Sequence, residues 1–231
     1  MVDSSTLPAQ ILVSKPNDSA PASEWLERFD DVYRSADGNS ADIPWAHPKP
    51  NRSLIQWLNT EARHHVRCGA RVCVVGCGLG YDALALAQRG FDVTAFDASP
   101  NAIESARTMH DGHDIRFQVA DLFDLPSSLS GRFDLAVEVH TLQSLPPAHR
   151  TTLASSIASL LHRHGLVLAV ARGREESIAL DDVEGPPFAF TAGELESTMG
   201  VAGMRLATPV DKRSDDNAHG VLRLTALFER V

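Results

Sequence analysis

A regular alternation of apolar runs and helical patterns between residues 71 and 171 most constrains how this chain can fold. Apolar runs of strand length lie at Arg71–Val75, Phe91–Phe96, Ile115–Val119, Phe133–Val139 and Leu166–Ala171. Between most of them, apolar residues recur at helical spacing, at Asp82–Arg89, Pro100–Met109 and Ala148–His162. Strands that alternate with helices of this length form β-α-β units with right-handed crossovers. The sequence therefore predicts a doubly wound α/β fold with a mostly parallel sheet.

The end of the chain departs from this alternation. The apolar runs Met204–Val210 and Val221–Phe228 are separated by a polar segment without a helical pattern, so we expect a terminal antiparallel hairpin. With these two runs the sheet is predicted to have seven strands. Helix starts are also readable, because Ser99 is a favoured N-cap and Thr191 with Glu194 forms a capping box.

Composition excludes several classes of function. The chain has 21 basic and 30 acidic residues, a net charge of −9 that argues against binding to nucleic acid. Its longest apolar run, Leu166–Ala171, is far shorter than the ~20 residues of a membrane span. The N-terminus lacks the pattern of a signal peptide, and three cysteines without a Cys-x-x-Cys pair predict neither disulfides nor structural zinc. We therefore expect a cytoplasmic protein that binds neither membrane nor nucleic acid.

A glycine-rich loop follows the first predicted strand of the alternation. It reads Gly76-Cys-Gly78-Leu-Gly80-Tyr81, and Asp97 ends the next strand 21 residues after Gly76. Glycines let the backbone approach a ligand closely, and the carboxylate of Asp97 can accept hydrogen bonds from ribose hydroxyls. The dinucleotide motif requires a small residue where this chain has Tyr81, and the phosphate-loop ending Gly-Lys-Ser/Thr is absent. These residues favour a nucleoside cofactor without pyrophosphate, such as S-adenosylmethionine.

Four motifs in this order resemble those of class I S-adenosylmethionine-dependent methyltransferases. They are the glycine loop, then Phe96-Asp97-Ala98-Ser99, Val119-Ala-Asp121-Leu122 and Phe133-Asp-Leu-Ala-Val-Glu138-Val139. The resemblance implies a Rossmann-like methyltransferase fold whose cofactor, S-adenosylmethionine, is bound along these motifs. The binding residues it implies are Gly76, Gly78, Gly80, Asp97, Ala98, Asp121, Leu122, Glu138 and Val139.

Shorter motifs resemble the thiopurine and thiol/halide methyltransferase branch of that class. They include Trp25-x-x-x-Phe29, Pro44-Trp45 and Gly185-Pro-Pro-Phe188. The resemblance implies that Trp25, Phe29 and Trp45 close over the cofactor. The family often has Trp where this chain has Phe29, which loses a ring N–H. The same spacing of aromatics also fits a helix that simply packs by its apolar face.

The resemblance also divides the chain into segments. Residues 1–20 lack apolar periodicity and are expected to be a loose tail. We expect residues 21–50 to form an N-terminal helical cap over the cofactor, and residues 51–231 to form the methyltransferase domain. Within that domain, residues 172–190 are the expected active-site loop.

The resemblance implies methyl transfer to a thiol or another soft nucleophile, on a small-molecule substrate. An O- or N-methyltransferase of a secondary metabolite is the alternative, and a non-catalytic nucleoside-binding module is a third hypothesis. His140 directly follows the fourth strand, so it could act as the base that deprotonates a thiol; it could equally only pack there. No metal site is predicted, because the adjacent pair His64-His65 cannot present both rings on one helix face.

Overall fold

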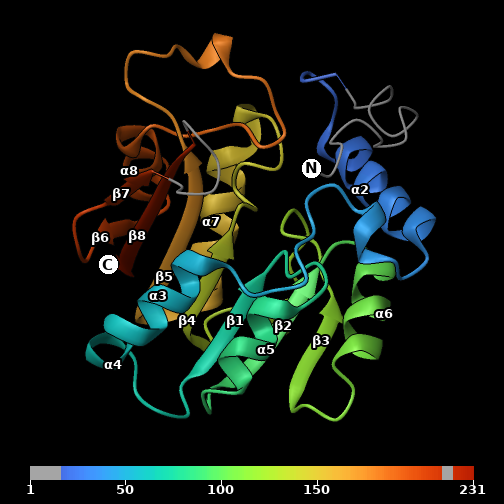
Figure 1. The fold of residues 1–231 in the computed structure, drawn as a ribbon. Helices are drawn as coiled ribbons and strands as arrows, with labels where there is room; N and C mark the ends of the chain where they lie inside the picture. The colour runs from blue at the N-terminus through green and yellow to red at the C-terminus, as the bar shows by residue number, and fades with distance from the viewer. Residues whose placement is uncertain (1–16, 215–220) are drawn as a thin grey trace.

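The computed structural model describes residues 17–214 and 221–231. Its strands are β1 Arg71–Val75, β2 Asp92–Asp97, β3 Ile115–Val119, β4 Phe133–Val139, β5 Leu161–Gly173, β6 Met204–Leu206, β7 Asp211–Ser214 and β8 Leu222–Arg230. They form one sheet with the order β3-β2-β1-β4-β5-β8-β6, and β7 also pairs with β8 (Figure 1). Strands β1 to β5 are parallel, whereas β8 is antiparallel to β5, β6 and β7. The predicted doubly wound, mostly parallel fold is confirmed.

Helices cover both faces of this sheet. They are α2 Ala22–Ala36, α3 Arg52–Thr60, α4 Ala62–His65, α5 Tyr81–Ala87, α6 Pro100–Met109, α7 Arg150–Leu160 and α8 Ala192–Val201. Helices α3, α4, α5 and α6 share one apolar cluster with Val72 and Val74 of β1. Helices α7 and α8 share another with Cys73 and Val75, because successive residues of a strand face opposite sides. The two clusters form the core on the two faces of the sheet.

The prediction of seven strands is wrong, because the sheet has eight. The run expected as one strand from Met204 to Val210 forms only the short β6, and β7 follows as a separate strand. Both pair with β8, at its opposite ends. Pro209 lies between β6 and β7 and has no backbone N–H to donate to β8, which accounts for an interruption there. The polar segment 215–220, before β8, lies outside the described residues, as does most of the expected loose tail.

Two predicted helix starts are confirmed. The Ser99 side chain accepts a hydrogen bond from the N–H of Ala102 at 2.9 Å, and this caps α6. Thr191 and Glu194 form the reciprocal capping box of α8. Both caps fix helices that begin at the carboxyl edge of the sheet, where parallel strands place ligands.

Helix α2, within the segment expected to be a cap, is fixed to α6 by one carboxylate. Asp30 accepts hydrogen bonds from the Ser99 hydroxyl at 2.6 Å and from the Asn101 amide at 2.9 Å. Although partial burial raises the pKa of Asp30, these hydrogen bonds lower it below its usual value. Asp30 therefore connects α2 to the residues that follow Asp97.

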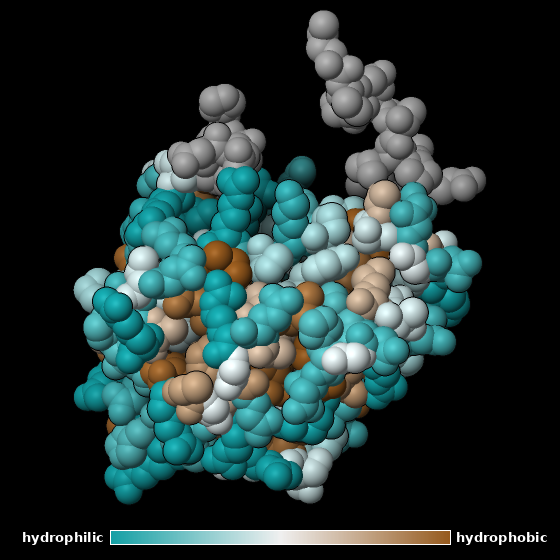
Figure 2. Space-filling view, turned by 60° about the horizontal axis from the view of Figure 1, so that its bottom comes forward, coloured by the Kyte–Doolittle hydropathy of each residue, from teal (hydrophilic) through white to brown (hydrophobic). Residues whose placement is uncertain are grey.

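Figure 2 shows a face covered mostly by hydrophilic residues, with hydrophobic residues in separate small areas among them. Such scattered apolar residues are ordinary for a protein surface. No helix in the described part of the chain is long and apolar enough to cross a membrane.

We predict that Asp30→Ala loosens α2 without unfolding the sheet. The variant loses the hydrogen bonds to Ser99 and Asn101, each worth about 1.5–3 kcal/mol when the acceptor is charged. Hydrogen exchange of α2 amides should become several-fold faster, while that of β1 amides stays unchanged. The matched control is Asp31→Ala, because Asp31 forms its ion pair with the exposed Arg34 of the same helix. Equal exchange in the two variants would contradict the prediction.

Candidate functional site

The glycine loop lies where β1 ends, and none of its three glycines has room for a side chain. Gly76 has a φ of +57°, and a Cβ there would lie 2.5 Å from the Thr141 hydroxyl oxygen. Gly78 has a φ of +49°, and a Cβ there would lie 2.8 Å from the Tyr33 hydroxyl oxygen. Both constraints require glycine, since the left-handed region disfavours other residues. The loop therefore presents bare backbone at the carboxyl edge of the sheet.

Asp97 ends β2 beside this loop and holds it. One carboxylate oxygen accepts the Gly78 N–H and the other accepts the Ser99 N–H, each at 2.9 Å. Burial raises the pKa of Asp97, while these backbone N–H groups act in the opposite direction. Ala98 follows directly and is only partly buried. Each carboxylate oxygen has a second lone pair that a ribose hydroxyl could use.

The ends of β3 and β4 bring further carboxylates to the same edge. Asp121 follows β3, and its side chain accepts the Phe123 N–H at 2.9 Å. Leu122 beside it is buried. Glu138 in β4 is fully buried, pairs in register with Val75, and accepts the Thr141 N–H at 2.9 Å.

The second oxygen of Glu138, Oε1, is buried and has no hydrogen-bond partner among the described residues. Burial raises the pKa of Glu138 to about 8. Val139, the next residue, ends β4 and is partly buried. A buried carboxylate oxygen without a donor fits a cationic group such as the ammonium of an amino acid.

An aromatic cluster stands over this edge. Trp25 is almost fully buried, with ring centroids 6.3 Å from Phe29 and 6.0 Å from Phe188. The ring centroids of Phe29 and Trp45 are 5.5 Å apart. The Trp45 indole N–H donates a hydrogen bond to the Tyr33 hydroxyl at 3.0 Å. The three aromatics predicted as cofactor residues thus form one cluster, which Tyr33 joins to Gly78. The Trp25 indole N–H is buried without a partner among the described residues.

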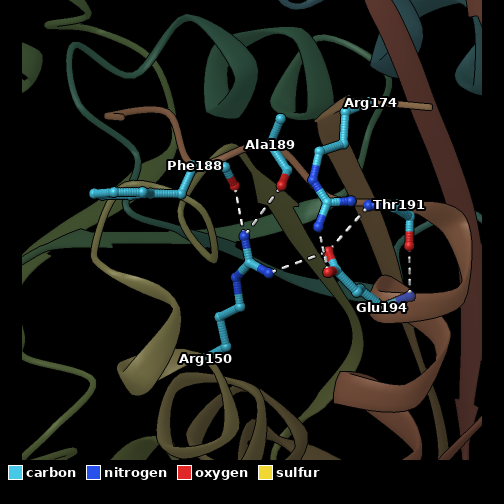
Figure 3. Close-up of polar contacts among 6 residues, drawn as sticks. All are labelled: Arg150, Arg174, Phe188, Ala189, Thr191 and Glu194. Carbon is cyan, nitrogen blue, oxygen red and sulfur yellow. Dashed lines mark hydrogen bonds and ion pairs between the residues drawn. The ribbon is translucent and has the colours of Figure 1, made fainter. Parts of the chain in front are cut away.

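Phe188 belongs to the expected active-site loop, and Arg150 binds carbonyl groups of this loop (Figure 3). Arg150 donates to the carbonyls of Phe188 and Ala189, at 2.7 and 3.3 Å, and pairs with Glu194 at 3.4 Å. Arg174 pairs with the same glutamate, so both guanidinium groups share one carboxylate. Arg150 therefore has structural partners within the protein.

His140 lies directly after β4, as the sequence predicted, with a φ of +64°. Its Nε2 accepts a hydrogen bond from Nη1 of Arg223, in β8, at 3.0 Å. Burial and the charge of Arg223 lower the pKa of His140 to about 4. A guanidinium cannot accept a hydrogen bond, so Nε2 of His140 is the acceptor and the proton of the neutral ring is on Nδ1. The nitrogen lone pair with which His140 would remove a proton therefore points to Arg223.

No group of three or more His, Cys, Asp or Glu side chains in the part of the chain that the structure describes could hold a metal ion. His65 instead stacks near Trp57, with ring centroids 6.5 Å apart.

The sequence matches the family model of thiopurine S-methyltransferase over residues 23–231. The chain belongs to the thiopurine S-methyltransferase family. The predicted resemblance to class I S-adenosylmethionine-dependent methyltransferases of this branch is thereby confirmed. The cofactor of the family is S-adenosylmethionine, and the backbone at the three loop glycines, Asp97 and the unpartnered oxygen of Glu138 fit it.

Relatives with different named activities match different lengths of this chain. The chain is 33% identical over 99 residues to a ubiquinone biosynthesis O-methyltransferase of Xanthomonas axonopodis pv. citri (strain 306), covering 42% of this chain and 41% of that protein. It is 28% identical over 162 residues to a thiopurine S-methyltransferase of Bordetella petrii, covering 63% and 70%. The chain thus spans about two fifths of the length of the first of these relatives.

Solved structures share the fold. A Burkholderia thailandensis 1,6-didemethyltoxoflavin-N1-methyltransferase with bound S-adenosylhomocysteine has a TM-score of 0.70 at 20% identity, covering 95% of this chain and 93% of that one. A structure described under conversion of a disulfide bond into a thioacetal group during echinomycin biosynthesis has a TM-score of 0.71 at 23% identity, covering 89% and 91%. At these identities the likeness shows the fold alone.

Two neighbours of the predicted site residues were not predicted. Tyr33 continues the Trp25–Phe29 spacing by four residues, so its place on the same helix face was readable. Arg223 carries no such signal, because its contact with His140 arises from pairing between strands that are distant in sequence.

We predict that Gly76→Ala destabilises the protein more than Gly112→Ala does. Both positions have positive φ, which costs about 1–2 kcal/mol for alanine. Only Gly76 also meets a neighbour, since a Cβ at Gly112 has nothing within 4 Å. The overlap with Thr141 should add about 1–3 kcal/mol to the loss in free energy of unfolding. Denaturant titration measures the free energy of unfolding of both variants. Equal losses in Gly76→Ala and Gly112→Ala would refute the steric argument.

Glu138→Gln should change how stability depends on pH. A carboxyl group with a folded pKa of about 8 and an ordinary value of 4.5 binds its proton more tightly in the folded state. Its contribution to the free energy of unfolding therefore falls as pH rises from about 4.5 to 8, by up to about 1.4 kcal/mol per unit. Glutamine remains uncharged, so the variant should gain stability relative to the parent over this range. A difference that does not vary with pH would contradict the raised pKa.

Proposed function

We propose that this protein is an S-adenosylmethionine-dependent methyltransferase that methylates a thiol, or another soft nucleophile, of a small molecule. One observation carries the proposal. Backbone without Cβ atoms, the carboxylate of Asp97 and the unpartnered oxygen of Glu138 meet at the carboxyl ends of adjacent strands in a member of the thiopurine S-methyltransferase family.

The proposed cofactor residues divide by the part of the molecule they suit. Asp97 and Ala98 suit the ribose, with Gly76, Gly78 and Gly80 lining the loop beneath it. Asp121 and Leu122 suit the adenine, and Glu138 with Val139 suits the amino-acid part. Trp25, Phe29 and Trp45 supply aromatic faces, and cation–π attraction to a sulfonium is worth about 0.5–2 kcal/mol.

When bound, the cofactor supplies an activated methyl group that a nucleophile displaces in line. The chain's own contribution is alignment and exclusion of water, which the aromatic cluster and the anchored Phe188 segment provide. A thiol has a reference pKa of about 8.5, so a positive environment is needed to raise its thiolate fraction at neutral pH.

The position of His140 directly after β4 makes it a candidate base for this deprotonation. Its geometry favours another role, because Nε2 is engaged by Arg223 and the lowered pKa makes the ring a weak base. We therefore propose His140 as a positioning residue for Arg223.

A second candidate is methyl transfer to oxygen. The ubiquinone biosynthesis O-methyltransferase of Xanthomonas shares 33% identity, but over only 99 residues. Transfer to oxygen or nitrogen would use the same cofactor residues with a different acceptor pocket.

Calorimetric titration with S-adenosylhomocysteine tests the cofactor assignment. The parent should bind it, and Asp97→Ala should weaken binding at least about tenfold, because two backbone N–H partners and the ribose acceptor are lost together. The matched control is Asp92→Ala at the opposite end of β2, where the side chain pairs with Arg116. Absence of binding to the parent would overturn the proposal.

Incubation with labelled S-adenosylmethionine and a panel of thiols, phenols and amines identifies the acceptor atom. We expect thiols to be labelled, because a soft nucleophile needs the least help from a base. If phenols or amines are labelled and thiols are not, S-methylation is contradicted and transfer to oxygen or nitrogen takes its place.

A further inference from the structure

His110, which follows α6, is a buried histidine in contact with the glycine loop. The residue is only 5% exposed, and its Nε2 lies 2.8 Å from the carbonyl oxygen of Leu79 in that loop. Because a carbonyl oxygen only accepts hydrogen bonds, Nε2 carries the proton and donates it to Leu79. Burial is the largest influence on the pKa of His110 and lowers it, so the ring is neutral at pH 7. The ring therefore supplies one neutral donor to the backbone of the loop.

The hydrogen bond from His110 completes the contacts of one peptide group in the loop. This group joins the Leu79 carbonyl to the Gly80 N–H, and the Gly80 N–H donates to the Cys77 carbonyl at 2.9 Å. A peptide group is planar, so hydrogen bonds at both of its ends fix the orientation of its plane. The glycines on either side of Leu79 both have positive φ, +49° at Gly78 and +81° at Gly80. His110 thus fixes the peptide plane between two glycines that the loop presents.

Two aromatic rings fix the orientation of the His110 ring. Its centroid is 5.2 Å from that of Tyr81, at an interplanar angle of 82°, and 6.1 Å from that of Phe117, at 23°. The ring also packs directly against the loop, because a Cβ at Gly80 would lie 3.0 Å from Cδ2 of His110. Packing therefore sets the direction in which Nε2 donates.

Packing alone does not account for a histidine at this position. A phenylalanine would fill the same space without burying ring nitrogens, which is costly unless they form hydrogen bonds. Without the donor, the carbonyl of Leu79, a residue that is only 5% exposed, would lose this hydrogen bond. Turning the peptide group toward another donor would change φ of Gly80, and with it the backbone of the loop. The polar contact of His110 therefore bears on the shape of the loop.

We propose that His110 is a positioning residue of the cofactor site, which sets the backbone of the glycine loop through the Leu79 carbonyl. This inference rests on the proposed function, because the loop is the proposed binding site of S-adenosylmethionine. His110 packs at the Gly80 end of the loop, whereas Thr141, in the segment after β4, meets the Gly76 end. Loss of the donor should therefore weaken binding of the cofactor and raise its KM, while kcat at saturation stays close to that of the parent.

The test uses two variants that differ only in the reach of an amide. His110→Gln places an amide nitrogen where Nε2 lies, whereas the side chain of His110→Asn is one carbon shorter and does not reach Leu79. Both variants lose the ring, so their melting temperatures should fall alike. Calorimetry with S-adenosylhomocysteine should give a Kd within about threefold of the parent for His110→Gln and at least about tenfold weaker for His110→Asn, the factor expected for one buried hydrogen bond.

A second pair separates the ring from its donor. His110→Phe keeps an aromatic ring between Tyr81 and Phe117 but cannot donate, so its Kd for S-adenosylhomocysteine should also weaken about tenfold. The matched control is His113→Phe, because His113 is exposed in the turn that follows His110. It should bind S-adenosylhomocysteine as the parent does.

Hydrogen exchange of the Gly80 amide tests the same contact without a cofactor. Exchange should be several-fold faster in His110→Asn and His110→Phe than in the parent and His110→Gln. If the parent binds S-adenosylhomocysteine and both variants without the donor bind it equally well, the inference is overturned and the proposed function stands. Binding by His110→Gln that is as weak as that of His110→Asn would also overturn it. If the parent does not bind S-adenosylhomocysteine, the proposed function fails, and the Gly80 exchange alone decides whether His110 positions the loop.

Discussion

The close approach of the glycine loop to three other parts of the chain is the constraint on which this structure depends. A Cβ at Gly76 would meet Thr141 after β4, one at Gly78 would meet Tyr33 of α2, and one at Gly80 would meet the Phe117 ring of β3. Each missing side chain thus admits a different neighbour. The loop is in contact with the segment after β4, with helix α2 and with the edge of the sheet at once, so its backbone sets how closely these parts meet.

The charges around the loop separate into two halves. On the cofactor side, burial raises the pKa of Asp97 and Glu138, so these carboxylates lack the solvation that would stabilise their charge. A cationic ligand would supply it. On the other side of Thr141, Arg223 and Arg172 give positive charge. Buried carboxylates of this kind suit S-adenosylmethionine, the cofactor of the family, because it carries a sulfonium and an ammonium group.

The features predicted from sequence are those that local chemistry decides. The glycine loop, Asp97 at the end of its strand and the Ser99 cap each depend on residues within a few positions of one another, and β1, β3 and β4 have the predicted bounds. The interruption between β6 and β7 and the contact of Arg223 with His140 depend instead on which distant strands pair. Periodicity along one segment carries no information about its partner, so neither could be read from the sequence.

A series of contacts joins helix α2 to the segment around Phe188. Phe188 is held by Arg150 through its carbonyl and contacts Trp25 through its ring. Trp25 then contacts Phe29, and Asp30 beside it binds the segment after Asp97. A displacement of the Phe188 segment would therefore remove a neighbour of the aromatic cluster over the cofactor side. Helix α2, the segment around Phe188 and the residues after Asp97 are therefore joined through one continuous set of contacts.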